Sequence, residues 1–283
     1  MLTLVPGGMG GSEVYARSLA RELPRHRDLD VTALVSRAAA GLSGAAREIV
    51  AERLAGGGSS MGRLATMARS TVPGADVRRV LGRTDVVHYP LTVPVPRRPR
   101  STPTVQTLLD VQHHDLAELF SVQERAYRAL AYDRPARRAD VVMTISEFCK
   151  ARIMETLGVP AERVRVAHLG VDATTFSPYD GPREQFVLYP ARGWPHKNHE
   201  RLIAAVERLR VDRPDLRLVL TGGGASRLGP LPSWVEHRGL VPEVELVELY
   251  RRAACLAFPS QYEGFGLPPL EAMASGCPVA AAS

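Results

Sequence analysis

The sequence predicts an α/β protein with two domains, each a doubly wound parallel sheet covered by helices on both faces. Its 283 residues are enough to bury two separate cores. Apolar strand-like runs alternate with amphipathic helix patterns almost throughout, which is typical of parallel sheets. The strand-like runs are apolar on both faces, so helices should cover both sides. We expect strands at residues 30–35, 85–89, 103–108, 140–145, 186–189, 216–221, 255–258 and 278–281, and helices at 13–23 and 199–209.

A turn-rich segment marks the boundary between the two domains. Residues 177–183 read SPYDGPR, which is rich in turn formers and poor in apolar residues. We therefore expect an N-terminal domain at 1–178, a linker at 179–184 and a C-terminal domain at 185–283. Residues 55–60, AGGGSS, are expected to form a mobile loop. Residues 1–5 should belong to a first strand, and the second domain should be incomplete, since no helix follows 278–281.

Composition and cysteine usage indicate a cytoplasmic protein. No run of 18 or more apolar residues occurs, so we expect no membrane-spanning helix. Residues 1–5 are apolar but lack a basic flank, which argues against a signal peptide. Cys149, Cys255 and Cys277 lie far apart without metal-ligand spacing. This usage predicts reduced thiols.

The formal net charge of +6 favours anionic partners such as a nucleotide, an acidic membrane surface or a nucleic acid. Arginines gather at residues 97–100 and again at 134–138. They are either solvated helix faces or a surface that rests on anionic lipid headgroups, and composition does not separate the two. No helix-turn-helix, zinc or RNA-binding signature is present, so no nucleic acid is expected. A dinucleotide fingerprint is excluded because residues 8–13, GMGGSE, lack its third glycine.

The most informative stretch is residues 263–276, EGFGLPPLEAMASG, which follows the apolar run at 255–258. The two prolines suit the first turn of a helix, and Gly276 is placed to end it. A glycine-containing loop before a helix N-terminus presents backbone N–H groups to anions, so the backbone at Gly264, Gly266 and Leu267 could hold a phosphate. Glu263 and Glu271 would place two carboxylates beside the same cleft. Taken singly, Glu271 could equally be an acid stabilised by the helix dipole, by about 0.3–1 kcal/mol.

This stretch resembles the Glu-x7-Glu signature of retaining glycosyltransferases of the GT-B fold, particularly glycosyltransferase family 4. The resemblance covers nearly all 283 residues and is strongest from about Asp140 onward. It implies that Glu263 contacts the donor sugar and that Glu271 contacts the ribose hydroxyls. It also places the Phe265–Leu267 backbone near the diphosphate.

A second segment, RGWPHKN at residues 192–198, is similar to the family's Arg/Lys donor motif. The resemblance implies that Arg192 and Lys197 grip the diphosphate, where fixed cations would stabilise the charge that grows on the leaving group. We interpret Asn198 as a helix N-cap. Weaker resemblances place Gly222 in the donor site, and Leu240 in the turn that meets the nucleobase.

The N-terminal half adds further resemblances and one departure. Residues 6–13, PGGMGGSE, resemble the family's first glycine-rich loop, which implies that Gly10 and Gly11 lie near the donor phosphates. Relatives often carry an active-site histidine where this chain has Leu109, so that role is not carried over. Asp110, His113 or His114 could take a nearby role in acceptor binding. The alternative is a polar surface loop.

The family resemblance implies two Rossmann-like domains facing across a cleft. The expected reaction is transfer of a sugar from a nucleoside diphosphate sugar to a glycan or lipid-linked acceptor, with retention and by front-face attack. Overall similarity favours mannose from GDP-mannose, although the residues do not distinguish guanine from uracil. No metal and no cofactor is expected, because the two cations can carry the charge. The alternative left open is a non-catalytic protein that binds a nucleotide or sugar phosphate, and peripheral contact with the inner face of a membrane is also left open.

Overall fold

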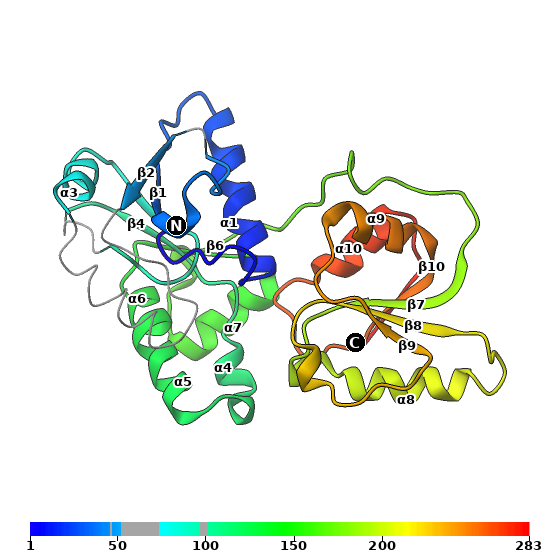
Figure 1. Ribbon diagram of the computed structural model, residues 1–283. Coiled ribbons are helices and arrows are strands. Elements are labelled where there is room, and N and C mark those ends of the chain that lie inside the picture. The colour runs from blue at the N-terminus through cyan, green and yellow to red at the C-terminus, as the bar shows by residue number, and fades with distance from the viewer. Residues whose placement is uncertain (46, 52–73, 97–100, 283) are drawn as a thin grey trace. The chain divides into compact units, whose positions relative to one another are not determined.

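The computed structural model describes residues 1–45, 47–51, 74–96 and 101–282 (Figure 1). The expected loop at 55–60 and the arginines at 97–100 lie outside the described residues. The chain forms two compact units, Met1–His168 and Leu169–Ser283. Residues 169–178, which the sequence interpretation placed in the first domain, group with the second unit. Among the described residues, no helix is long and apolar enough to cross a membrane.

The described residues of the N-terminal unit form two parallel sheets. Strands β3 (Val87–Tyr89), β4 (Thr104–Thr107), β5 (Val141–Thr144) and β6 (Val164–Val166) form one sheet in that order. Strands β1 (Ala33–Ser36) and β2 (Glu48–Ala51) pair in the other. The helices of this unit are α1 (Gly11–Glu22), α3 (Ala75–Leu81), α4 (Gln112–Asp115), α5 (Val122–Arg128), α6 (Arg134–Ala136) and α7 (Glu147–Leu157).

Local chemistry explains where several of these helices begin and end. The Ser146 hydroxyl accepts a hydrogen bond from the Cys149 N–H at the start of α7, and Gly158 ends that helix in the left-handed region. Ser121 caps α5 in the same way. A single π-helical turn, Ala129–Asp133, then connects α5 to α6. A π-helical segment, which is rare in proteins, therefore lies between two short α-helices.

The C-terminal unit is a five-stranded parallel sheet in the order β11-β10-β7-β8-β9. Its strands are β7 (Glu184–Pro190), β8 (Arg217–Thr221), β9 (Val235–His237), β10 (Ala253–Phe258) and β11 (Val279–Ala281). Helix α8 (His199–Leu209) lies on one face, and α9 (Glu243–Arg252) and α10 (Leu267–Ala274) lie on the other (Figure 1).

Side chains along β7 alternate between the two cores of this unit. Phe186 and Leu188 pack in the core that includes α9 and α10, whereas Val187 and Tyr189 pack in the core that includes α8. All four side chains are buried. A strand buried on both faces needs apolar residues at every position, which is why the run at 186–189 does not alternate with polar residues.

The strand order gives this sheet a topological switch point. Numbered along the chain from β7, the order reads 3-2-1-4-5, which is the order of a doubly wound nucleotide-binding fold. From β7 the chain adds β8 and β9 on one side, and it then returns to add β10 and β11 on the other side of β7. In such sheets ligands bind beyond the carboxyl ends of the two strands that flank this point. The loops that follow β7 and β10 are therefore where a site is expected.

The structure corrects the sequence interpretation at a few elements. Residues 1–5 form a turn instead of a strand. The Leu4 N–H donates to the Met1 carbonyl, so this donor is not available to pair with a neighbouring strand. Strands β2, β6 and β9 were not predicted. Each is short and includes a charged residue, Glu48, Arg165 or Glu236, so no continuous apolar run marks it. The eight predicted strands and both predicted helices are present, with ends shifted by no more than three residues.

Candidate functional site

The loop after β7 is held against the end of β8. Ala191 N–H donates to the Thr221 carbonyl at 2.9 Å, and Gly193 N–H donates to the Gly223 carbonyl at 3.0 Å. A Cβ on Gly193 would lie only 2.4 Å from the Gly224 carbonyl oxygen. This position therefore requires glycine for close approach of two backbones. The packing fixes the path of the loop before it reaches Lys197.

The same loop is cross-linked to the loop after β10. The His196 carbonyl accepts hydrogen bonds from the Gln261 N–H at 2.8 Å and from the Ser260 hydroxyl at 3.4 Å. Asn198 donates its side-chain amide to the Pro259 carbonyl at 3.2 Å. Asn198 thus occupies the N-cap position of α8 without capping it, since its side chain is used across the loops. The interpretation of Asn198 as a capping side chain was wrong.

This cross-link brings a lysine and a glutamate together at the switch point. The Lys197 ammonium donates to the Glu263 carboxylate at 2.5 Å. Their side chains are 16% and 25% exposed, so the pair is partly shielded yet open to solvent. Tyr189, from the end of β7, donates its hydroxyl to the Lys197 carbonyl at 2.7 Å. Two of the predicted donor residues are therefore in direct contact, although 66 positions separate them.

A cavity of about 700 Å³ within the C-terminal unit is lined by Glu263 of this pair but not by Lys197. Glu263, Phe265 and Gly266 line it together with Arg201 from α8. Gly266 has a φ of +97° and occupies the N-cap of α10, and Leu267 is the first residue of that helix. The positive φ lets the chain turn from the loop into the helix, as a glycine allows. The helix N-terminus adjoins the cavity, so its partial positive charge favours an anion there.

Glu271 lies one turn into α10 and is held by a buried tyrosine. Tyr250, from α9, is fully buried and donates its hydroxyl to Glu271 at 2.8 Å. Burial raises the pKa of Glu271 to about 7, with the nearby Glu243 carboxylate adding to the rise and the Tyr250 hydrogen bond opposing it. Glu271 does not line the 700 Å³ cavity. The structure therefore separates the predicted pair Glu263 and Glu271 into one cavity-facing and one tyrosine-bound carboxylate.

Three other predicted donor residues lie on neighbouring loops outside that cavity. The Arg192 guanidinium lies 5.7 Å from the centre of the Trp194 ring. Gly222 has a φ of +119°, and a Cβ there would lie 2.6 Å from the Ala191 carbonyl oxygen. Leu240 is exposed in the turn after β9. The Arg192 backbone lies next to Gly222, and the Leu240 side chain lies next to Gly223.

In the N-terminal unit, Gly10 and Gly11 form the start of α1. Gly10 is the N-cap with a φ of +59°, and its carbonyl accepts from the Glu13 N–H at 3.0 Å. A Cβ on Gly11 would meet nothing within 4 Å. This helix N-terminus is thus accessible to a ligand, as the resemblance implies, although no contact of the described residues assigns it one.

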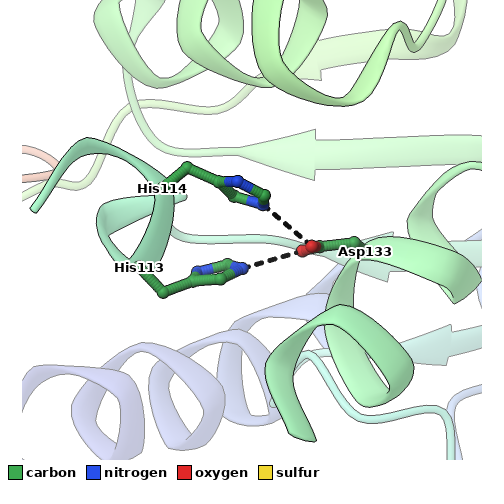
Figure 2. Close-up of side chains that lie close together, drawn as sticks. All are labelled: His113, His114 and Asp133. Atoms are coloured by element: carbon green, nitrogen blue, oxygen red, sulfur yellow. Dashed lines mark hydrogen bonds and ion pairs between the residues drawn. The ribbon is translucent and has the colours of Figure 1, made fainter. Parts of the chain in front are cut away.

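The two predicted acceptor residues are used inside the protein. The Asp110 carboxylate accepts from the Gln112 N–H at 3.1 Å, which starts α4. His113 is buried against Asp133, whose other oxygen contacts His114 (Figure 2). His114, and not His113, is the partly exposed ring in this group. A second cavity, of about 530 Å³, opens beside these three side chains.

Sequence reasoning missed Tyr250 and Asp133. Tyr250 lies among apolar positions of a helix and is indistinguishable there from a core aromatic. Asp133 lies in an arginine-rich segment that was interpreted only through its charge. A buried aspartate twenty residues after a histidine pair gives no local pattern. Only the folded arrangement shows these contacts.

A family model described as Glycosyltransferase Family 4 matches residues 9–175, and one described as Glycosyl transferases group 1 matches residues 180–283. The first match alone covers more than half of the chain. The chain belongs to glycosyltransferase family 4. The border between the two matches falls within residues 175–180, close to the turn-rich segment.

Two curated relatives show how this family 4 chain compares with known proteins. It is 33% identical to MMP α-(1→4)-mannosyltransferase of Mycolicibacterium hassiacum over 159 residues. This match covers 52% of this chain and 38% of the relative. It is 32% identical over 203 residues to D-inositol 3-phosphate glycosyltransferase of Mycobacterium sp. strain KMS, which covers 64% of this chain and 45% of the relative. The matches thus span less than half the length of these relatives.

A solved structure supports the fold. The Anabaena protein HepE, crystallised in complex with UDP and glucose, aligns with a TM-score of 0.64 and 19% identity. The alignment covers 96% of this chain and 77% of HepE. Together with the parallel sheets described above, it confirms the predicted α/β architecture of GT-B type with two Rossmann-like units.

Proposed function

We propose that this family 4 chain is part of a retaining glycosyltransferase that binds a nucleoside diphosphate sugar in its C-terminal unit. The sugar would pass to a hydroxyl of a glycan or lipid-linked acceptor, without a metal in the transfer step. The observation that carries the proposal is the Lys197–Glu263 contact at the topological switch point. It places a cation and a hydroxyl acceptor side by side where doubly wound sheets bind nucleotides.

The lysine supplies the charge that the reaction needs. As the bond between sugar and phosphate breaks, negative charge grows on the diphosphate, and a fixed cation stabilises that state more than the ground state. In this structure Glu263 pairs with the Lys197 cation. A bound diphosphate would replace the carboxylate as the partner of Lys197, leaving Glu263 to accept hydrogen bonds from sugar hydroxyls. The departing diphosphate would take the acceptor proton in a front-face attack.

The remaining donor residues would act around this pair. Arg192 is two residues beyond β7 and would need to leave the Trp194 ring to reach a phosphate. Gly266 and Leu267 would present backbone N–H groups at the N-terminus of α10. Glu271, oriented by Tyr250, would accept from the ribose hydroxyls. Gly10 and Gly11 are proposed to meet the donor phosphates from the N-terminal unit.

For the donor we propose mannose from GDP-mannose. The support is that a relative with 33% identity over the matched region is a mannosyltransferase. HepE, in contrast, was crystallised with UDP and glucose. Leu240 and its neighbours in the turn after β9 are the residues proposed to face the base.

Titration calorimetry of the chain against GDP, UDP and ADP tests donor binding. A charge-assisted hydrogen bond contributes about 1.5–3 kcal/mol, so Lys197→Ala should weaken the preferred nucleotide by roughly 10- to 150-fold. The matched control is Lys150→Ala, because Lys150 is the other lysine and lies in the N-terminal unit. Equal affinity in Lys197→Ala and wild type would refute the proposed site.

Catalysis needs a separate readout, because binding alone would also fit a non-catalytic nucleotide-binding protein. Release of GDP from GDP-mannose, or of UDP from UDP-glucose, can be followed with water as the acceptor. We expect slow release that Lys197→Ala abolishes. Tight nucleotide binding with no cleavage of either donor would favour the non-catalytic alternative.

Peripheral membrane contact is proposed for the α5–α6 region. Leu119, Val122 and Leu130 are exposed there, close in sequence to the exposed Arg125 and Arg134. Apolar side chains flanked by arginines suit an anionic membrane surface. We expect sedimentation with phosphatidylglycerol vesicles but not with phosphatidylcholine vesicles, and loss of binding in Val122→Gln/Leu130→Gln. Val211→Gln, which changes an exposed valine of the C-terminal unit, is the control. Binding unchanged in the double variant would refute this surface.

A further inference from the structure

Two histidines and one aspartate of the N-terminal unit converge on one point. His113 and His114 come from α4, and Asp133 is the last residue of the π-helical turn that follows α5. Figure 2 shows both rings directed at the same carboxylate. His113 Nε2 lies 3.0 Å from Asp133 Oδ1, and His114 Nε2 lies 2.8 Å from Asp133 Oδ2. The three candidate ligand atoms, one from each side chain, lie within 4.8 Å of one another.

The group is closed on one side and open on the other. The side chains of His113 and Asp133 are each 2% exposed, whereas that of His114 is 33% exposed. All three line the cavity of about 530 Å³, whose other wall is mainly apolar and comes from α5 and the π-helical turn. A small ion could therefore enter from the cavity and meet two nitrogens and a carboxylate.

The charge on the group suits a cation. Asp133 brings its carboxylate between two imidazoles, so the group offers both oxygen and nitrogen lone pairs to a cation. The arginine that lines the same cavity, Arg125, is exposed, so water screens its charge. It could also attract an anionic fourth ligand.

The backbone that presents Asp133 is unusual. Single π-helical turns are rare and often occur at functional sites, because they shift a side chain out of the α-helical register. Here the turn ends at Asp133 and also carries Tyr132, whose ring packs edge-on to His113 with centroids 6.2 Å apart. The same turn thus supplies the carboxylate and fixes one of the imidazoles.

We propose that His113, His114 and Asp133 bind a divalent transition-metal ion of the zinc class, with one coordination position open to the cavity. Two imidazoles and one carboxylate form a ligand set that zinc accepts in sites with an open position. Such ligands lie about 2.0–2.2 Å from zinc, which places neighbouring ligand atoms of a tetrahedral site about 3.4 Å apart. The two nitrogen–oxygen distances here are 3.0 and 2.8 Å, so these atoms would need to move apart by only about 0.5 Å when an ion replaces the two hydrogen bonds. The proposed function does not depend on this site.

The surroundings also set the expected strength of binding. A zinc-bound imidazole normally donates its other N–H to an acceptor, and losing that partner costs about 10- to 100-fold in affinity. His113 Nδ1 is buried and has no hydrogen-bond partner among the described residues. We therefore expect binding weaker by about that factor than at a zinc site with a complete outer shell.

Equilibrium dialysis of the full chain against Zn²⁺, followed by elemental analysis, tests the proposal. We expect one equivalent of zinc in the wild type, and Co²⁺ in its place should give the visible absorption of a low-coordinate site. Asp133→Asn and His114→Gln should each weaken binding at least about 10-fold. The control His26→Gln, which changes an exposed histidine far along the chain, should bind as wild type does.

Two results would overturn the metal site. The first is no saturable zinc binding by the wild-type chain, which would leave the group as a hydrogen-bonded cluster only. The second is binding that His114→Gln leaves unchanged, which would assign the zinc to other residues. Because His114 is partly exposed, that variant should fold even if the buried Asp133→Asn variant does not. A thermal unfolding curve of each metal-free variant shows which proteins are folded.

Discussion

Replacing Glu271 by glutamine should stabilise the C-terminal unit at high pH and leave its stability almost unchanged at low pH. Burial, together with the nearby Glu243, raises the pKa of the Glu271 carboxyl to about 7 from 4.5. The folded protein therefore holds a proton there that the unfolded chain releases between these two values. Stability from this group is fully present below about pH 4.5 and is lost as the pH rises to about 7. Glutamine keeps an oxygen for the Tyr250 hydroxyl but has no charge to bury.

The size of the effect follows from the pKa difference. One pKa unit corresponds to about 1.36 kcal/mol, so a rise from 4.5 to about 7 corresponds to roughly 3 kcal/mol as an upper figure. We expect Glu271→Gln to exceed wild type by up to that amount above pH 8 and by at most about 0.8 kcal/mol at pH 5. The same substitution should weaken nucleotide binding, because the amide nitrogen cannot accept from a ribose hydroxyl.

Urea unfolding followed by tryptophan fluorescence measures this difference. Both tryptophans, Trp194 and Trp234, lie in the C-terminal unit, so the signal reports on the unit that contains Glu271. The control is Glu200→Gln, which removes an exposed carboxylate from α8 of the same unit. If Glu271→Gln changes the free energy of unfolding equally at pH 5 and pH 8.5, then the carboxylate is not desolvated as described.

Backbone geometry and burial lead to four more expectations. Gly222→Ala places a Cβ 2.6 Å from the Ala191 carbonyl oxygen at a φ of +119°, so it should cost roughly 2 kcal/mol or more. Gly11→Ala, with nothing within 4 Å, should be neutral or slightly stabilising; because both tryptophans lie in the other unit, urea unfolding of this variant and the next is followed by circular dichroism. Ser146→Ala removes the hydrogen bond to Cys149 at the start of α7 and should cost about 1 kcal/mol; no change in the unfolding midpoint would mean that the cap is dispensable. Burial raises the pKa of Cys149 to about 11, so this thiol should not react with Ellman's reagent at pH 8 until urea is added, and fast reaction in the native protein would contradict its burial.

The long strands of the sheets could be predicted from sequence because burial on both faces leaves a continuous apolar run. Residues 186–189 and 216–221 are examples, and both became central strands. The short strands β6 and β9 lie at sheet edges and contain Arg165 or Glu236 within three residues. So few positions cannot show a period, and such strands are set by pairing with a neighbour that only the fold supplies.

The candidate site was predictable only in part for a related reason. The motifs around Lys197 and Glu263 identified both residues, but their contact depends on β7 and β10 being neighbours in the sheet. Strand order is a property of the whole unit and not of either motif. The same holds for Tyr250, whose hydroxyl finds Glu271 only because α9 and α10 pack on one face. Contacts within one loop can be predicted from the sequence, whereas contacts between distant segments require the fold.

The His196 carbonyl, which accepts from the backbone of Gln261, has a consequence for how this enzyme family can change. Main-chain atoms make that link, so the side chain at 261 can be exchanged without releasing it. That side chain is exposed and borders the 700 Å³ cavity. Under the proposed function, substitutions there would reshape the wall of the sugar site while the main-chain link keeps Lys197 and Glu263 in contact.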